Sequence, residues 1–186
     1  VAGVMGCPNL SVDQGHPLDV NDAEGVVYAA SEGAGAWEFA ACNPDASPMR
    51  ILASSYIEDK PLRFCESAEK GHSNRGDSGR IIDSIGEEGE PARLDSQCKY
   101  ALVARGQADG YLRLPTSKSY VEKIWDHAAG MCIAQEAGAV VSDVNGTPLD
   151  FSHGKRLENN RGVICAIDGL QQQIIHSISD LGIGQD

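Results

Sequence analysis

The chain has 186 residues, of which 41% are hydrophobic and 23% charged, and its formal charge at neutral pH is −12. This length and composition are typical of one or two folded globular domains. The acidic balance excludes a general nucleic-acid surface, which needs clustered Lys and Arg, and no apolar run reaches the ~20 residues of a membrane helix.

The first fifty residues read as strands and turns. Apolar or alternating residues predict strands at 1–5, 25–30 and 36–41. The Gly33-Ala-Gly35 sequence predicts a tight turn between the second and third of these strands. The polar stretch 43–48 then predicts a linker, because it combines Asn, Asp, Ser and two prolines.

From about residue 50 the pattern alternates between strand and helix. The expected extended segments are 50–54, 63–66, 93–96, 111–114, 140–143 and 161–166. The expected helices are 78–85, 97–107, 125–137 and 170–181, the third of them closed by Gly138. Such alternation predicts a layered α/β domain.

Six cysteines are scattered along the chain without any Cys-x-x-Cys pair. Their even number would allow three disulfides, but their dispersal and the lack of an export signal favour free thiols in a reducing compartment. We therefore expect a cytoplasmic protein. An organelle is the alternative, because the sequence does not begin with methionine and a targeting segment could precede it.

One segment places a carboxylate beside a tryptophan at the head of a helix rich in small residues. It runs Glu122-Lys-Ile-Trp-Asp-His-Ala-Ala-Gly130 and continues to Glu136-Ala-Gly138, with a turn at Pro148-Leu-Asp-Phe151. A carboxylate there can bind a hard cation, close to backbone N–H groups that bind phosphate oxygens. The alternative is that Asp126 only caps the helix and Trp125 only fills a core.

Three further blocks complete a family resemblance. They are Gly3-Val-Met-Gly-Cys-Pro-Asn-Leu10, Glu69-Lys-Gly-His-Ser73, and Asp95-Ser-Gln-Cys-Lys-Tyr100 leading to Asp109-Gly-Tyr-Leu-Arg-Leu-Pro115. In this order the blocks resemble the 3'(2'),5'-bisphosphate nucleotidases, which are magnesium-dependent, lithium-sensitive phosphomonoesterases of the inositol monophosphatase superfamily. The Trp-Asp and Glu-Ala-Gly signature is shared across the superfamily. Glu-Lys-Gly-His and Asp-Ser-Gln-x-Lys-Tyr are typical of the nucleotidase branch, so an inositol phosphate phosphatase is the less favoured alternative.

The chain departs from the family pattern in two respects. Ala139 stands where the family usually has a second glycine. The Asp-Pro-Ile-Asp-Gly-Thr motif and an upstream Glu-Glu pair, which supply most metal ligands and the water-activating groups, are absent. We therefore expect the C-terminal portion of a layered sugar-phosphatase-like fold, with 1–49 as strands of an N-terminal α+β domain and 50–186 as a C-terminal α/β domain. The water-activating catalytic residues are unknown, and a separate N-terminal half is a possible partner.

The resemblance also implies a reaction and a site. The family removes the 3'-phosphate of adenosine 3',5'-bisphosphate to give AMP, and so serves sulfate assimilation. The implied metal is Mg²⁺, with Asp126 as its ligand near the scissile phosphate. The implied substrate-binding residues are Lys70, His72, Ser96, Lys99, Arg113 and Asp126. Arginine can bind phosphate through two parallel hydrogen bonds, lysine supplies a point charge, and serine donates a hydroxyl hydrogen bond.

Several of these residues have simpler alternatives. Ser96 fits an N-cap, Arg113 a surface ion pair, and Ser119-x-x-Glu122 a capping box. Lys99 falls on the first turn of its helix, where the macrodipole disfavours a cation, and this favours a ligand role. An alternative of another class is a non-catalytic nucleotide-binding fragment, which alone would bind AMP with a Kd of roughly millimolar order and hydrolyse almost nothing.

Overall fold

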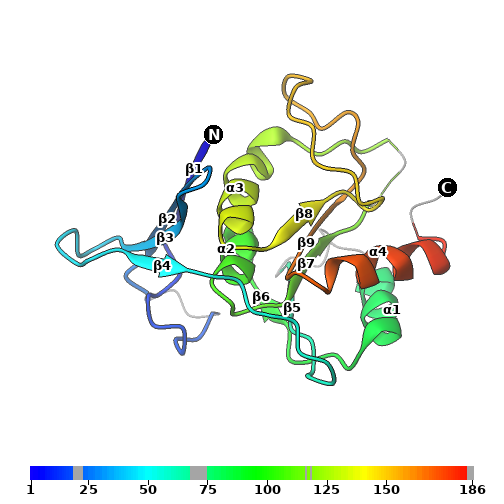
Figure 1. The fold of residues 1–186 in the computed structure, drawn as a ribbon, viewed down its shortest axis with the longest axis horizontal. Helices are drawn as coiled ribbons and strands as arrows, with labels where there is room; N and C mark the ends of the chain where they lie inside the picture. Colours follow the sequence, from blue (N-terminus) through cyan, green and yellow to red (C-terminus); the bar gives the residue numbers. More distant parts are fainter. Residues whose placement is uncertain (19–22, 68–74, 116, 118, 184–186) are drawn as a thin grey trace.

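The computed structural model describes residues 1–18, 23–67, 75–115, 117 and 119–183. Four layers follow one another across the molecule: an antiparallel sheet, a pair of helices, a mixed sheet and a second pair of helices (Figure 1). Each layer covers an apolar face of the next, which is how helices and sheets bury their hydrophobic sides. The predicted layered α/β architecture is confirmed.

The first sheet has four antiparallel strands in the order β1-β2-β3-β4. They are β1 (Ala2–Cys7), β2 (Val26–Ser31), β3 (Gly35–Ala40) and β4 (Met49–Ile51). Alternate residues of β1 are buried, so that one face of the strand packs on the helix layer. The turn between β2 and β3 needs glycine, because Gly33 and Gly35 have φ values of 75° and 78°.

The middle layer joins the two sheets. It consists of α2 (Cys98–Ala104) and α3 (Ala128–Glu136), the latter preceded by the 3₁₀ turn η1 (Ile124–Asp126). Helix α3 packs on β1, β2 and β3 on one side and on β8 on the other. It also lies very close to α2, since a Cβ at Gly130 would stand 2.4 Å from Cδ2 of Tyr100. Only glycine fits at that contact.

The second sheet has five strands in the order β6-β5-β7-β9-β8. They are β5 (Phe64–Glu66), β6 (Ala92–Arg93), β7 (Gly110–Arg113), β8 (Val140–Ser142) and β9 (Val163–Ala166). β5 pairs in parallel with β6 and β7, whereas β9 pairs antiparallel with β7 and β8. Helices α1 (Arg75–Ile85) and α4 (Gln171–Asp180) form the outer layer. Every residue of β9 is buried, as expected for a strand covered on both faces.

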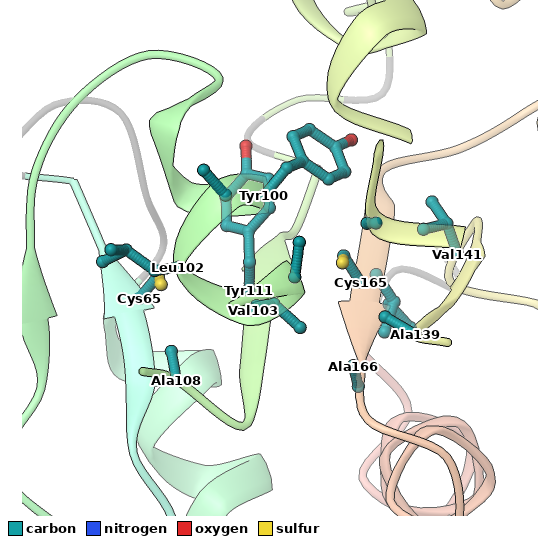
Figure 2. Packing of buried hydrophobic residues seen from close by; sticks show 14 of the residues in the cluster. Cys65, Tyr100, Leu102, Val103, Ala108, Tyr111, Ala139, Val141, Cys165 and Ala166 are labelled. Carbon is teal, nitrogen blue, oxygen red and sulfur yellow. The ribbon is translucent and has the colours of Figure 1, made fainter. Parts of the chain in front are cut away.

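The core between α2 and the second sheet is built from aromatic and small residues (Figure 2). Tyr100 of α2 and Tyr111 of β7 meet edge to face, with ring centroids 5.2 Å apart. Cys65 and Cys165 lie in this core, and burial raises the pKa of the Cys65 thiol to about 12. All six cysteines are free thiols in the structure.

The predicted elements are found with shifted ends. The helix expected at 97–107 ends at Ala104, because Gly106 has a φ of 76° and leaves the helix. The helix expected at 125–137 is two elements, since His127 has a φ of −135° and separates η1 from α3. The proposed boundary between 49 and 50 falls inside β4, and the division into two domains stays a prediction. None of the helices described is long and apolar enough to cross a membrane.

Candidate functional site

A cavity of about 450 Å³ lies where β1, α2, β7 and η1 meet. Its volume is within the range of small-molecule sites. The lining residues are Met5, Gly6, Ser67, Asp95, Ser96, Gln97, Cys98, Lys99, Tyr111, Arg113, Asp126 and His127. The structure therefore brings together four of the six predicted site residues, namely Ser96, Lys99, Arg113 and Asp126. Lys70 and His72 lie outside the described residues.

Lys99 is a buried cation on the wall of this cavity. Only 4% of its surface is exposed. Its Nζ donates a hydrogen bond to the Leu94 carbonyl at 3.3 Å and stands 5.3 Å from the ring centroid of Tyr111. Burial lowers the pKa of Lys99, and the nearby Asp95 carboxylate acts in the opposite direction. An anion bound in the cavity would favour the charged form of this lysine.

Arg113, at the end of β7, is held by the carboxylate of Glu122, which does not line the cavity. Its Nε donates to both oxygens of Glu122, at 3.0 and 3.1 Å, and one terminal nitrogen lies 3.4 Å from the hydroxyl of Tyr120. The ion pair predicted for Arg113 is present, but it is not a surface pair, because the Glu122 side chain is only 5% exposed. Burial alone would lower the pKa of Arg113. The Glu122 carboxylate outweighs burial and raises this pKa, so that Arg113 stays charged.

His127 extends this network into the core. Its Nε2 lies 3.2 Å from Oε2 of Glu122, and its Nδ1 lies 2.8 Å from the Tyr100 hydroxyl. Burial would raise the pKa of Glu122, but the hydrogen bond to His127 and the charge of Arg113 outweigh it and lower the pKa. An ionised carboxylate can only accept, so Nε2–H of His127 donates to Glu122, while Nδ1 forms the second hydrogen bond of the ring, with the Tyr100 hydroxyl.

Glu122 is not the helix-capping residue that its sequence pattern predicts. Among residues 119–127, which the structure describes, the first helical turn is η1, which begins at Ile124 after an extended Lys123. The backbone carbonyl of Glu122 accepts instead from the amide of Leu157, while its side chain turns inward to Arg113 and His127. The four-residue pattern Ser-x-x-Glu carries no information on which way an extended segment points its side chains.

Ser96 lines the cavity in an unusual backbone conformation. Its φ is +66°, in the left-handed region that most residues avoid. Its Oγ accepts a hydrogen bond from the amide of Cys98 at 3.3 Å, but the N-cap residue of α2 is Gln97, so the N-cap interpretation of Ser96 is wrong. The side chain is nevertheless exposed and lines the cavity.

Asp126 ends η1 and lines the cavity as an exposed residue. Trp125 beside it is 57% exposed, so the core-filling interpretation of that tryptophan is wrong. Gln97 fixes the turn, because its Nε2 donates to the Trp125 carbonyl at 2.7 Å and its Oε1 accepts from the amide of Gly130 at 2.9 Å. The sequence reasoning overlooked Gln97, although it lies within the Asp-Ser-Gln block.

The described residues contribute few candidate metal ligands. Within this part of the chain, no group of three His, Cys, Asp or Glu side chains is arranged to hold a metal ion. The exposed carboxylate of Asp126 fits as a single oxygen ligand of Mg²⁺, which usually retains several waters and takes only one or two protein carboxylates.

Known structures share this fold. The inositol monophosphatase of Anabaena (Nostoc) sp. PCC 7120 superposes with a TM-score of 0.61 at 17% identity, covering 84% of this chain and 57% of that chain. A 2'AMP-bound SaIMPase-II superposes with a TM-score of 0.57 at 18% identity, covering 82% of this chain and 51% of that chain. The chain belongs to the inositol monophosphatase family, whose sequence model matches residues 1–182.

Within this family, the chain is similar to the 3'(2'),5'-bisphosphate nucleotidases. It is 40% identical over 177 residues to that of Schizosaccharomyces pombe, covering 95% of this chain and 50% of the relative. It is 41% identical over 190 residues to that of Emericella nidulans, covering 95% of this chain and 53% of the relative. The resemblance inferred from the motifs is confirmed, and the chain spans about half the length of these curated relatives.

Proposed function

We propose that this chain forms the nucleotide-binding part of a 3'(2'),5'-bisphosphate nucleotidase, which removes the 3'-phosphate of adenosine 3',5'-bisphosphate to give AMP and phosphate. The observation that carries the proposal is the convergence of two cations, a hydroxyl and a carboxylate on one cavity. The similarity to nucleotidases over 95% of the chain supports the same substrate class.

The charges of the cavity suit a phosphorylated ligand. The chain as a whole carries a charge of −12, so an anion is attracted only where cations are concentrated. Arg113 has its Nε committed to Glu122 and one terminal nitrogen near the Tyr120 hydroxyl, which leaves the N–H groups of its other terminal nitrogen for phosphate oxygens. Lys99 adds a second positive charge held in a largely desolvated position. Ser96 adds a hydroxyl to the lining of the cavity.

Asp126 is the residue that we propose to hold Mg²⁺. When bound, the ion would act as a Lewis acid on the phosphoryl oxygens and help the leaving alkoxide. The described residues place no cluster of three metal-ligating side chains around Asp126, so it acts as one ligand among several. We propose that the remaining ligands and the groups that activate water come from residues outside this sequence, since the matched relatives are about twice as long.

The cellular setting follows from the same proposal. A bisphosphate nucleotidase would serve sulfate assimilation and would be sensitive to lithium. Six free cysteines fit a reducing compartment such as the cytoplasm.

Calorimetric or NMR titration of the 186-residue chain with AMP tests the proposal. We expect binding with a Kd of roughly millimolar order. We expect Lys99→Met to weaken this binding about tenfold, because a buried charge then no longer faces the phosphate. Lys155→Met is the matched control, since Lys155 is exposed and lies outside the cavity.

Two outcomes would contradict the proposal. Equal or tighter binding of inositol 1-phosphate would favour an inositol phosphatase instead. Rapid Mg²⁺-dependent hydrolysis of adenosine 3',5'-bisphosphate by this chain alone would overturn the requirement for residues outside it.

A further inference from the structure

We infer that Glu122 and His127 are positioning residues that hold Arg113 in place for a bound phosphate and tie it to the turn that carries Asp126. The inference rests on the proposed function and adds to it two residues that act through Arg113 and the Asp126 turn. It is based on the hydrogen bonds that link Tyr100 to His127, His127 to Glu122, and Glu122 to Arg113.

The network has an inner and an outer part. Arg113 and His127 line the cavity, whereas Glu122 and Tyr100 do not. Tyr100 is fully buried, and the side chains of His127 and Glu122 are 1% and 5% exposed. The buried side chains of this network therefore support Arg113, which a ligand in the cavity can reach.

The hydrogen bonds form a chain from the core to the guanidinium, in which the Glu122 carboxylate is the acceptor shared by His127 and Arg113. The Tyr100 hydroxyl fixes Nδ1 of His127 at 2.8 Å, and the other ring nitrogen is 3.2 Å from Oε2 of Glu122. Both oxygens of that carboxylate then accept from Nε of Arg113. A guanidinium anchored through Nε keeps its plane fixed, which reduces the conformational entropy lost when phosphate binds.

The same network reaches the proposed metal ligand through the backbone. His127 follows Asp126 directly, and its ring is clamped between Tyr100 and Glu122. The position of the Asp126 turn is thus linked to the position of Arg113 through two buried side chains. Burial protects this linkage from exchange with solvent, and an ionised Glu122 is the acceptor that both neighbours require.

A double-mutant cycle on AMP binding tests the inference, using Glu122→Gln and Arg113→Ala in the 186-residue chain. Glutamine keeps the size of the side chain but replaces one accepting oxygen by a donor. We expect Glu122→Gln to weaken AMP binding about tenfold and to have little further effect when Arg113 is already alanine. Glu122→Asp, which keeps the charge, should recover part of the affinity.

Other results would overturn the inference. If Glu122→Gln binds AMP as well as or more tightly than the unmodified chain, Glu122 only neutralises Arg113 and does not position it. If the two substitutions are additive, Glu122 does not act through Arg113.

A second readout remains usable if no variant binds nucleotide. The Nε–H resonance of Arg113 in a ¹⁵N-labelled chain reports the bond to Glu122 directly, and we expect Glu122→Gln and His127→Phe to shift it. An unmodified chain that shows this bonded resonance but binds no AMP would reject the proposed function while leaving the anchoring intact. A resonance that neither substitution moves would reject the anchoring itself.

Discussion

Cys98 begins α2 on the wall of the cavity, next to the buried Cys7 of β1. A hydrogen bond between the two thiols is the main reason that the pKa of Cys98 falls to about 6, whereas the pKa of Cys7 rises far above its usual range. Burial acts against this shift at Cys98, and the hydroxyl of Ser96 and the charge of Lys99 favour it. The pKa of Cys98 is therefore lower than that of an ordinary thiol, and we expect a larger thiolate fraction at neutral pH than at the other cysteines.

Alkylation by iodoacetamide, followed by peptide mass spectrometry, checks this state. Only the thiolate reacts, so the rate at Cys98 should rise with pH through a midpoint of about 6 and then level off. Cys7→Ala removes the hydrogen-bond donor, and the midpoint should then move up towards the ordinary value of 9.0. A midpoint near 9 in the unmodified chain would contradict the prediction.

Single residues show most clearly what the sequence could and could not predict. Asp126, Arg113, Lys99 and Ser96 were found through motifs, and the structure gathers them on one cavity. The role of Glu122 was missed, because its partners Arg113 and His127 are identified only once β7 and η1 are packed together. Motifs identify residues that a family retains, whereas buried supporting contacts depend on tertiary geometry.

At the scale of elements, the close packing of α3 on α2 depends on Gly130. In an open helix, glycine to alanine stabilises by about 1 kcal/mol. At Gly130 a Cβ would stand 2.4 Å from Tyr100, and overpacking of this kind costs about 1–3 kcal/mol. We therefore expect Gly130→Ala to lower the free energy of unfolding by up to about 2 kcal/mol in urea titrations.

Gly79 offers a matched control, since it lies in α1 and a Cβ added there would meet nothing from outside its own helix within 4 Å. Gly79→Ala should raise stability by up to about 1 kcal/mol. If both substitutions stabilise the chain, the contact between Gly130 and Tyr100 is not as close as described.

The elements themselves were predictable because their periodicity is local. Alternating residues marked β1 to β3, and spacing near 3.6 marked α2 and α4. The break between η1 and α3 was not predictable in this way. It arises at His127, whose side chain is bound by Tyr100 and Glu122 from other parts of the chain.

At the scale of the whole molecule, both sheets share one continuous core. Because α3 packs on strands of each sheet, we expect the chain to unfold in a single cooperative transition. The two tryptophans report on different regions, since Trp37 lies on β3 and Trp125 lies on η1. Urea titrations of Trp37→Phe and Trp125→Phe, followed by fluorescence, should each show one transition that coincides with the loss of circular dichroism in the same variant.

Fluorescence that changes before or after the circular dichroism in either variant would show that the first sheet and the rest of the molecule unfold separately. That result would support a division of the chain near residue 49. A single coincident transition would mean that the residues before and after position 49 unfold together, even if they form two structural domains.

The cavity has walls from both sides of the middle layer. Met5 and Gly6 of β1 line it together with residues of α2, β7 and η1. Helix α3 packs closely on β1, since its Ala129 backbone carbonyl would lie 2.9 Å from a Cβ at Gly3. A bulkier residue at Gly3 would push β1 away from this helix and displace Met5 and Gly6, which would change the cavity without altering any residue that lines it.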